Sequence, residues 1–276
     1  MALTVDTLDR VVEAALAEDV GQGDVTTDST VAPDSVGTAE LVTRAPGVVA
    51  GLDAAEAVFR ALDPDVTFER LVDEGATLAA PAPVARVSGS LRAILTGERT
   101  ALNLLGRLSG IATLTRRYVD TVAGTGAEIL DTRKTTPGLR SLEKHAVACG
   151  GGTNHRFGLD DGVLVKDNHL RAAGSVRAAV ERLRAATELP IEVECDTLEQ
   201  VEGALAAGVD AILLDNMSLD ELRAAVALTG EQARLEASGG VTLDTVRAVA
   251  ETGVDQVSVG ALTHSAPALD VSLELR

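Results

Sequence analysis

The side chains best suited to chemistry lie in one stretch of the sequence, residues 128–171. Two adjacent cations, Arg133 and Lys134, follow a short apolar run there, and Lys166 follows another. His155 and Arg156 come shortly after a run of three glycines. Guanidinium and ammonium groups bind carboxylates and phosphates, the former through paired hydrogen bonds. The stretch therefore predicts a binding site for a small ligand with several negative charges.

The net charge of the whole chain is opposite in sign to the net charge of this stretch. The formal net charge is −18 at pH 7, whereas cations slightly outnumber carboxylates within residues 128–171. A locally cationic site in an acidic protein suits a small polyanion better than nucleic acid or an anionic membrane. We therefore expect neither of these as a partner. The first residues include early carboxylates and no long apolar run, so we expect no signal peptide and a cytoplasmic location.

Short apolar segments alternate with amphipathic ones from residue 128 onward. The apolar segments, which predict strands, are 128–130, 162–165, 191–195, 211–214, 234–237 and 256–259. The amphipathic segments, which predict helices, include 175–187, 197–207, 219–228 and 243–252. Such alternation predicts parallel strands joined by right-handed crossovers. With a seventh strand near Asn154, the pattern fits an α/β barrel related to the (β/α)8 type but short of eight units.

Polar residues and glycines stand at the ends of these predicted strands. Glu194 and Asp215 occupy two of the ends. The last two loops are small and rich in glycine, with the sequences Ser238-Gly239-Gly240 and Gly260-Ala261. Ligands of such barrels bind at the carboxyl ends of the strands, and late glycine-rich loops often bind phosphate through backbone N–H groups. We therefore expect cations, carboxylates and a phosphate loop to share one face of the barrel.

The remaining chain predicts a smaller, mostly antiparallel α+β domain. Its expected strands are 37–44, 47–51, 66–71 and 84–88, with a helix at 53–62. Residues 91–123 are helical in pattern, but Gly97, Gly106 and Gly110 predict more than one helix there. Residues 269–275 alternate and predict a strand that returns to the small domain. We thus expect an N-terminal α+β sandwich domain at 1–110, joined by a strand at about 268–276, and a barrel domain at 111–267.

The two cysteines, Cys149 and Cys195, predict no site of their own. Their spacing is that of neither a zinc motif nor a small disulfide framework. We interpret both as reduced and mostly buried thiols.

Three motifs, in their order and spacing, closely resemble the quinolinate phosphoribosyltransferase family. They are DTRKT at 131–135, GGGTNHR at 150–156 and VLVKDNH at 163–169, and GERTALN at 97–103 resembles a further family motif. The resemblance implies an incomplete, roughly seven-stranded TIM-like α/β barrel. It also implies a reaction of de novo NAD biosynthesis. Quinolinate and phosphoribosyl pyrophosphate give nicotinate mononucleotide, pyrophosphate and carbon dioxide, with Mg²⁺.

The resemblance also implies a role for each matching residue. The quinolinate pocket would comprise Arg99, Thr132, Arg133, His155, Arg156 and Lys166. The phosphoribosyl pyrophosphate site would comprise Lys134, Glu194, Asp215, Ser238, Gly239, Gly240, Val259, Gly260 and Ala261. Lys134, Lys166, Glu194 and Asp215 would be catalytic, and Glu194 and Asp215 would hold Mg²⁺ through water. Family members form dimers, so we expect a homodimer or larger assembly in which Arg99 acts in the partner's site.

Three other functions remain open at this point. One is a paralogue of the same fold that is linked with molybdate-transport clusters and uses a different acceptor. The second is a nicotinate phosphoribosyltransferase that does not decarboxylate, and the third is a non-catalytic nucleotide-binding regulator. Arg99, Arg133, Arg156 and Lys166 favour a dicarboxylate ligand over the second and third. The sequence alone is less decisive against the paralogue.

Overall fold

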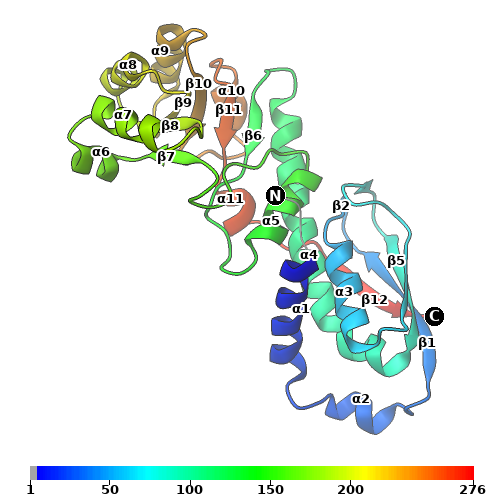
Figure 1. Ribbon diagram of the computed structural model, residues 1–276. Helices are drawn as coiled ribbons and strands as arrows, with labels where there is room; N and C mark the ends of the chain where they lie inside the picture. Colours follow the sequence, from blue (N-terminus) through cyan, green and yellow to red (C-terminus); the bar gives the residue numbers. More distant parts are fainter. Residues whose placement is uncertain (1–4) are drawn as a thin grey trace. The chain divides into compact units, whose positions relative to one another are not determined.

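The computed structural model describes residues 5–276, and its contacts divide the chain into two compact units (Figure 1). Unit 1 contains the chain up to Arg116, then Thr135–Gly151 and Leu262–Arg276. Unit 2 contains Arg117–Lys134 and Gly152–Ala261. The short helix α11, Ala261–His264, begins at the last residue of unit 2. Each unit is therefore assembled from segments that are distant in the sequence.

Unit 2 is built on a six-stranded sheet with the order β6-β11-β10-β9-β8-β7. Its strands are β6 (Glu128–Leu130), β7 (Val163–Val165), β8 (Ile191–Cys195), β9 (Ala211–Asp215), β10 (Arg234–Ser238) and β11 (Gln256–Ser258). Every pairing between them is parallel. The alternation of apolar and amphipathic segments thus predicted these strands correctly, and the mixed α/β fold with a parallel sheet is confirmed.

The seventh strand expected near Asn154 is reduced to a single bridge. Thr153 pairs in parallel with Leu130, outside the named strands. The Thr153 amide donates to the carbonyl of Ile129 at 2.8 Å, and the Asp131 amide donates to the carbonyl of Thr153 at 3.2 Å. These bonds place the segment that carries His155 beside the carboxyl end of β6.

Three of the helices in unit 2, α7, α8 and α9, begin at a capping side chain. They are α6 (Asp167–Ala173), α7 (Val176–Ala186), α8 (Leu198–Ala207), α9 (Leu219–Thr229) and α10 (Val246–Ala250). Ser175 and Thr197 accept the amides of Ala178 and Gln200 and so cap α7 and α8. Ser218 forms a capping box with Glu221 at the start of α9. Such caps satisfy amides that have no partner within the helix.

Unit 1 contains a four-stranded antiparallel sheet with the order β12-β1-β5-β3 and a two-stranded ribbon of β2 and β4. Its strands are β1 (Val36–Thr43), β2 (Gly47–Val48), β3 (Thr67–Arg70), β4 (Thr77–Leu78), β5 (Ala82–Ser90) and β12 (Val271–Leu275). The helices α1 (Val5–Val20), α2 (Val25–Thr30), α3 (Leu52–Leu62) and α5 (Arg140–Cys149) also lie in this unit. The C-terminal strand β12 pairs antiparallel with β1, opposite β5.

The long helix α4 runs without interruption from Leu91 to Val122, over 32 residues. The prediction that its glycines divide it is wrong, because they serve close packing instead. A Cβ atom on Gly110 would lie 2.0 Å from the carbonyl oxygen of Pro267, and one on Gly106 would lie 2.9 Å from that of Leu269. Glycine thus lets the segment before β12 cross the helix backbone directly. Of the helices in residues 5–276, α4 included, none combines the length and apolar character needed to cross a membrane.

Replacing Gly110 by alanine should destabilise the protein, although alanine normally stabilises a helix by about 0.5–1 kcal/mol relative to glycine. The added methyl group meets backbone atoms of Pro267, and overpacking of this kind costs about 1–3 kcal/mol. Gly203→Ala in α8 is the matched control, because a Cβ atom there meets nothing within 4 Å. Thermal unfolding of both variants checks the prediction. Equal melting midpoints for Gly110→Ala and Gly203→Ala would contradict it.

Candidate active site

A cavity of about 590 Å³ opens at the carboxyl ends of the strands in unit 2. It gathers most of the site residues expected from the sequence: Thr132, Arg133, Lys134, His155, Arg156, Lys166, Glu194, Asp215, Ser238, Gly239 and Gly240. The lining of this cavity does not include the three residues that follow β11, which are Val259, Gly260 and Ala261. Arg99 lies on α4 of unit 1, where it lines a cavity of about 420 Å³ together with Asn103 and Asp270.

The register of the parallel strands sets which side chains meet. Ser238 stands opposite Asp215 in the pairing of β10 with β9. Along β8, Ile191, Val193 and Cys195 are buried, while the intervening Glu192 and Glu194 are partly exposed. Successive side chains on a strand point to opposite faces. Glu192 and Glu194 therefore share one face of the sheet, the face from which Glu194 reaches the cavity.

An ion pair joins Lys166 to Glu194 across two neighbouring strands. The side chain of Lys166 is 47% exposed and that of Glu194 is 21% exposed, so both remain open to a ligand. Asp215 accepts a hydrogen bond from the amide nitrogen Nδ2 of Asn216 at 2.8 Å. A cation with two carboxylates on one rim is suited to a ligand that carries both phosphates and hydroxyl groups.

His155 lies between two carboxylates. Its Nε2 atom is 3.2 Å from Oε2 of Glu192 and 3.3 Å from Oε2 of Glu236. Burial by itself would lower the pKa of His155, but the hydrogen bonds to Glu192 and Glu236 and their charges outweigh it and raise the pKa to about 10. Burial raises the pKa of Glu192, while the hydrogen bond from His155 acts against that rise. The two carboxylates therefore favour the protonated form of the imidazole ring.

Two guanidinium groups share the same part of the cavity. Burial lowers the pKa of Arg156, and the positive charge of Arg133 adds to this effect. Arg156 donates from Nη1 to the carbonyl of Gly162 at 3.1 Å. The buried Asp131 accepts a hydrogen bond from the backbone amide of His155 at 2.9 Å. This bond holds the segment that carries His155 and Arg156. Like charges that are held together in this way favour a ligand with more than one carboxylate.

The turn after β10 requires glycine for two reasons. Gly239 has a φ of +104°, and a Cβ atom on it would lie 2.3 Å from Oδ1 of Asn216. Asn216 itself has a φ of 55°, and its backbone amide donates to the carbonyl of Ser238 at 2.9 Å. Gly240 has a φ of +59°, and a Cβ atom there would meet nothing within 4 Å. The turn thus exposes backbone at the rim of the cavity, an arrangement that suits an anion.

Sequence reasoning missed several residues that line the cavity or support it. Leu164, Leu213, Asn216, Glu236 and Ser258 contribute to the lining, and Glu192 lies beside His155. A signal was present for the two glutamates, because each is a carboxylate between two buried hydrophobic residues of its strand. Charged side chains are rarely buried unless they are paired. Such a position therefore indicates a partner that lies elsewhere in the sequence.

A parallel α/β sheet with cations, carboxylates and a glycine turn at its carboxyl ends defines a site for small polyanionic ligands. Two family models match this chain. The quinolinate phosphoribosyl transferase N-terminal domain matches residues 24–109, and the quinolinate phosphoribosyl transferase C-terminal domain matches residues 111–274. The chain belongs to the quinolinate phosphoribosyltransferase family.

Individual relatives agree with this assignment. The chain is 48% identical to a probable nicotinate-nucleotide pyrophosphorylase [carboxylating] of a Synechocystis strain, which covers 94% of this chain and 90% of that one. It is 47% identical to the corresponding protein of Mycobacterium leprae, covering 96% and 95%. The solved structure of the nicotinate-nucleotide pyrophosphorylase from Francisella tularensis superposes with a TM-score of 0.96 at 38% identity, covering 99% and 98% of the two chains.

The charge on His155 leads to a testable pH dependence. We expect His155 to titrate near pH 10, as measured by NMR on histidine-labelled protein and assigned with a His155→Asn variant. Because folding raises this pKa, the contribution to the free energy of unfolding is fully present below about pH 6.5 and is lost as the pH rises through about 10. In the double variant Glu192→Gln/Glu236→Gln, burial acts alone and the pKa should fall below its usual value.

The matched control is Glu202→Gln, which changes the same type of charge on an exposed position of α8. It should leave the titration of His155 unchanged. If His155 titrates at its ordinary pKa in the protein without substitutions, the pairing of His155 with Glu192 and Glu236 is contradicted.

Proposed function

We propose that this protein catalyses decarboxylating phosphoribosyl transfer. It converts quinolinate and phosphoribosyl pyrophosphate to nicotinate mononucleotide, pyrophosphate and carbon dioxide, a step of NAD biosynthesis. Family membership over both matched domains supports this function most directly. The cavity of unit 2 supports it independently, because its side chains match the charges of both substrates.

The cations around Arg133 match the chemistry of quinolinate, a pyridine with two adjacent carboxylates. Arg133, Arg156 and His155 line one cavity, and Glu192 and Glu236 favour the protonated form of the His155 ring. A guanidinium group binds a carboxylate through two parallel hydrogen bonds, which fixes the orientation of the ring as well as its position. Thr132 and Lys166 line the same cavity and complete the proposed set.

The other rim of the cavity matches phosphoribosyl pyrophosphate. Lys134 and Lys166 would hold pyrophosphate oxygens, while Glu194 and Asp215 would orient the ribose hydroxyls. The turn Ser238-Gly239-Gly240 would bind the 5′-phosphate through backbone N–H groups, with Val259, Gly260 and Ala261 extending this loop region. The open space at Gly240 supports such close approach of a ligand to the backbone.

These residues can promote both bond changes of the reaction. The quinolinate ring nitrogen attacks the ribose anomeric carbon as the bond to pyrophosphate breaks, and the lysines stabilise the departing negative charge. The alkylated pyridinium ring then accepts the electron pair of the breaking carbon–carbon bond as carbon dioxide leaves. A proton takes the vacated ring position. The chain's role is positioning and electrostatic stabilisation, and neither step needs a covalent nucleophile.

We also propose that Glu194 and Asp215 hold Mg²⁺ through water. Carboxylate oxygens are the donors that Mg²⁺ prefers, and both side chains line the cavity beside the proposed pyrophosphate site. The bound ion would neutralise charge on the leaving pyrophosphate.

Removal of one of these carboxylates should weaken the response to magnesium. We expect Asp215→Asn to raise the magnesium concentration for half-maximal rate by about tenfold, the scale of a lost outer-sphere partner. Initial rates across a magnesium titration measure this. Asp220→Asn is the control, because Asp220 lies exposed on α9. An unchanged magnesium response in Asp215→Asn would exclude the carboxylate from the ion's environment.

Quinolinate should be consumed with equal release of carbon dioxide and pyrophosphate, while nicotinate should be a poor substrate. Nicotinate has one carboxylate, so it leaves part of the cluster of Arg133, Arg156 and His155 without a counter-charge. Product analysis with each acid, phosphoribosyl pyrophosphate and magnesium checks this. Equal turnover of nicotinate would favour a non-decarboxylating transferase, and turnover of neither acid would favour the molybdate-linked paralogue or a nucleotide-binding regulator.

We further propose that the protein is a homodimer in which Arg99 of each subunit serves the site of the other. Arg99 lies in unit 1, within a segment that resembles a motif of the family, whereas the cavity described above is lined by residues of unit 2. A two-fold dimer would then contain two shared sites.

Mixing two inactive variants, Arg99→Ala and Lys134→Ala, tests this sharing. Each heterodimer would hold one doubly damaged site and one intact site, so an equal mixture should recover about a quarter of the unaltered activity by random pairing. Native mass spectrometry verifies that heterodimers have formed. Confirmed heterodimers without activity would show that Arg99 and Lys134 serve a site within one chain.

A further inference from the structure

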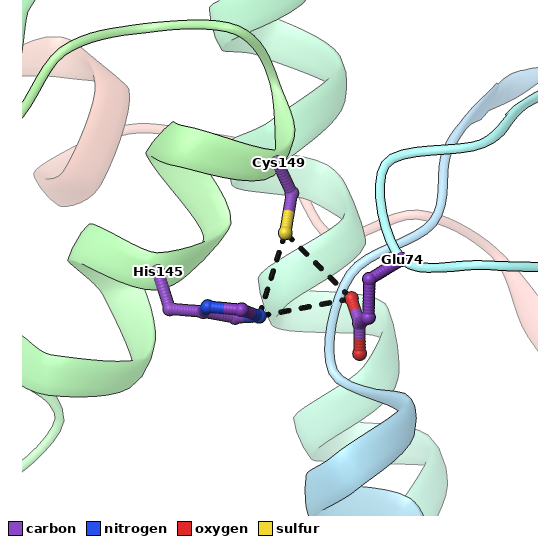
Figure 2. A group of neighbouring side chains, drawn as sticks. All are labelled: Glu74, His145 and Cys149. Atoms are coloured by element: carbon purple, nitrogen blue, oxygen red, sulfur yellow. Dashed lines mark hydrogen bonds and ion pairs between the residues drawn. The ribbon is translucent and has the colours of Figure 1, made fainter. Parts of the chain in front are cut away.

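Three side chains with different donor atoms converge on one point in unit 1, as Figure 2 shows for Glu74, His145 and Cys149. The Sγ atom of Cys149 lies 3.4 Å from Nε2 of His145 and 3.7 Å from Oε2 of Glu74. Nε2 of His145 lies 3.9 Å from the same carboxylate oxygen. His145 and Cys149 are four residues apart on α5 and so share a helix face, while Glu74 belongs to the turn between β3 and β4.

Each of the three groups can present a lone pair to their common centre. With its proton on Nδ1, the imidazole presents a lone pair at Nε2, and the carboxylate presents only lone pairs. The thiol then supplies a single hydrogen for two acceptors. The separation of 3.9 Å between His145 and Glu74 is also too long for a hydrogen bond. In this tautomer the cluster is rich in acceptors that face a common centre.

We propose that Glu74, His145 and Cys149 form a binding site for Zn²⁺ or a similar divalent transition-metal ion. Bonds of about 2.3 Å to sulfur and about 2.0–2.2 Å to nitrogen and oxygen place tetrahedral ligand atoms about 3.4–3.6 Å apart. The three separations of 3.4, 3.7 and 3.9 Å are close to these distances between ligand atoms. Shifts of about half an ångström or less would complete the geometry.

The charges of the three ligands balance the ion. A thiolate and a carboxylate together neutralise a divalent cation, so the half-buried site holds no net charge when it is loaded. Burial and the negative charge of Glu74 raise the pKa of Cys149 to about 12, so the sulfur is a protonated thiol without metal. On binding, the S–H bond breaks, sulfur donates its electron pair to the metal, and the proton leaves to solvent.

The surroundings hold the ligands in place. The Glu74 carboxylate accepts the backbone amide of Gly51 at 2.9 Å and that of Leu52 at 2.6 Å, at the start of α3. Gly75 permits the turn to approach α5 closely, because a Cβ atom on it would lie 3.2 Å from the carbonyl oxygen of Cys149. Hydrogen bonds of this outer-sphere kind orient metal ligands.

The donor set determines which ion fits. Thiolate and imidazole favour zinc and its neighbours over Mg²⁺, which prefers oxygen ligands, so this site would not compete for the magnesium of the proposed reaction. Three protein ligands leave a fourth position, and the His145 side chain is 30% exposed, which allows solvent to fill it. Among the described residues, His155, Glu192 and Glu236 form a second group at similar spacing, but it lacks sulfur and neighbours Arg156.

Titration of the whole, chelator-treated protein with Co²⁺ tests the proposal. Cobalt in this site should produce a thiolate-to-metal charge-transfer absorption that saturates at one ion per chain, and Zn²⁺ should abolish it by displacement. Cys149→Ser should eliminate this band. His145→Gln and Glu74→Gln should weaken cobalt binding by about 100-fold or more, at least the loss caused by removing an outer-sphere partner.

Cys195→Ser is the matched control, because Cys195 is the other free thiol and lies buried on β8. It should retain the full band and affinity. Glu74→Gln preserves an acceptor for the amides of Gly51 and Leu52, and melting in the presence of chelator verifies that each variant folds. A band that persists in Cys149→Ser, or unaltered protein that binds cobalt without the band, would overturn the assignment.

Discussion

The pairing of the half-buried His155 with two carboxylates is the interaction on which the cavity depends. Glu192 and Glu236 come from two different strands, and both approach the same imidazole nitrogen. Moving a single charged group out of water costs several kcal/mol, whereas an imidazolium paired with carboxylates is tolerated. The two glutamates therefore favour a protonated imidazole in the site. They also allow Arg133 and Arg156 to stand close by, because the local surplus of positive charge is reduced.

The parallel sheet supplies the geometry for this charge balance. Its strands end at one edge, so residues from β8, β9 and β10 that are far apart in the sequence meet there. Alternation along β8 directs Glu192 and Glu194 to one face at two depths, where the first pairs with His155 and the second with Lys166. One strand thus provides a less exposed countercharge, Glu192, and a more accessible carboxylate, Glu194. Rigid strands hold such groups more accurately than loops do.

Local patterns made much of this predictable from sequence. The strands of unit 2 were found because short apolar segments recur between capped helices, and the cavity residues were found because cations and glycines follow those segments. The continuity of α4 was not predictable, because the packing partners of Gly106 and Gly110 lie near residue 268. Glu236 was missed for a similar reason, since its partner His155 is remote in the sequence and joins the sheet through a single bridge at Thr153.

The cluster of Glu74, His145 and Cys149 shows the same limit more clearly. The spacing of His145 and Cys149 places both on one helix face, but a pair of this kind on an amphipathic helix is common without a metal. The third donor, Glu74, comes from a turn that is distant in the sequence. Only the close approach of this turn to α5 at Gly75 brings the Glu74 carboxylate near Cys149. Local sequence can therefore reveal charges that stand at strand ends, because the fold class dictates where strand ends meet. It cannot reveal convergence that depends on one glycine contact between separate segments, and such sites have to be read from the three-dimensional arrangement of donor atoms.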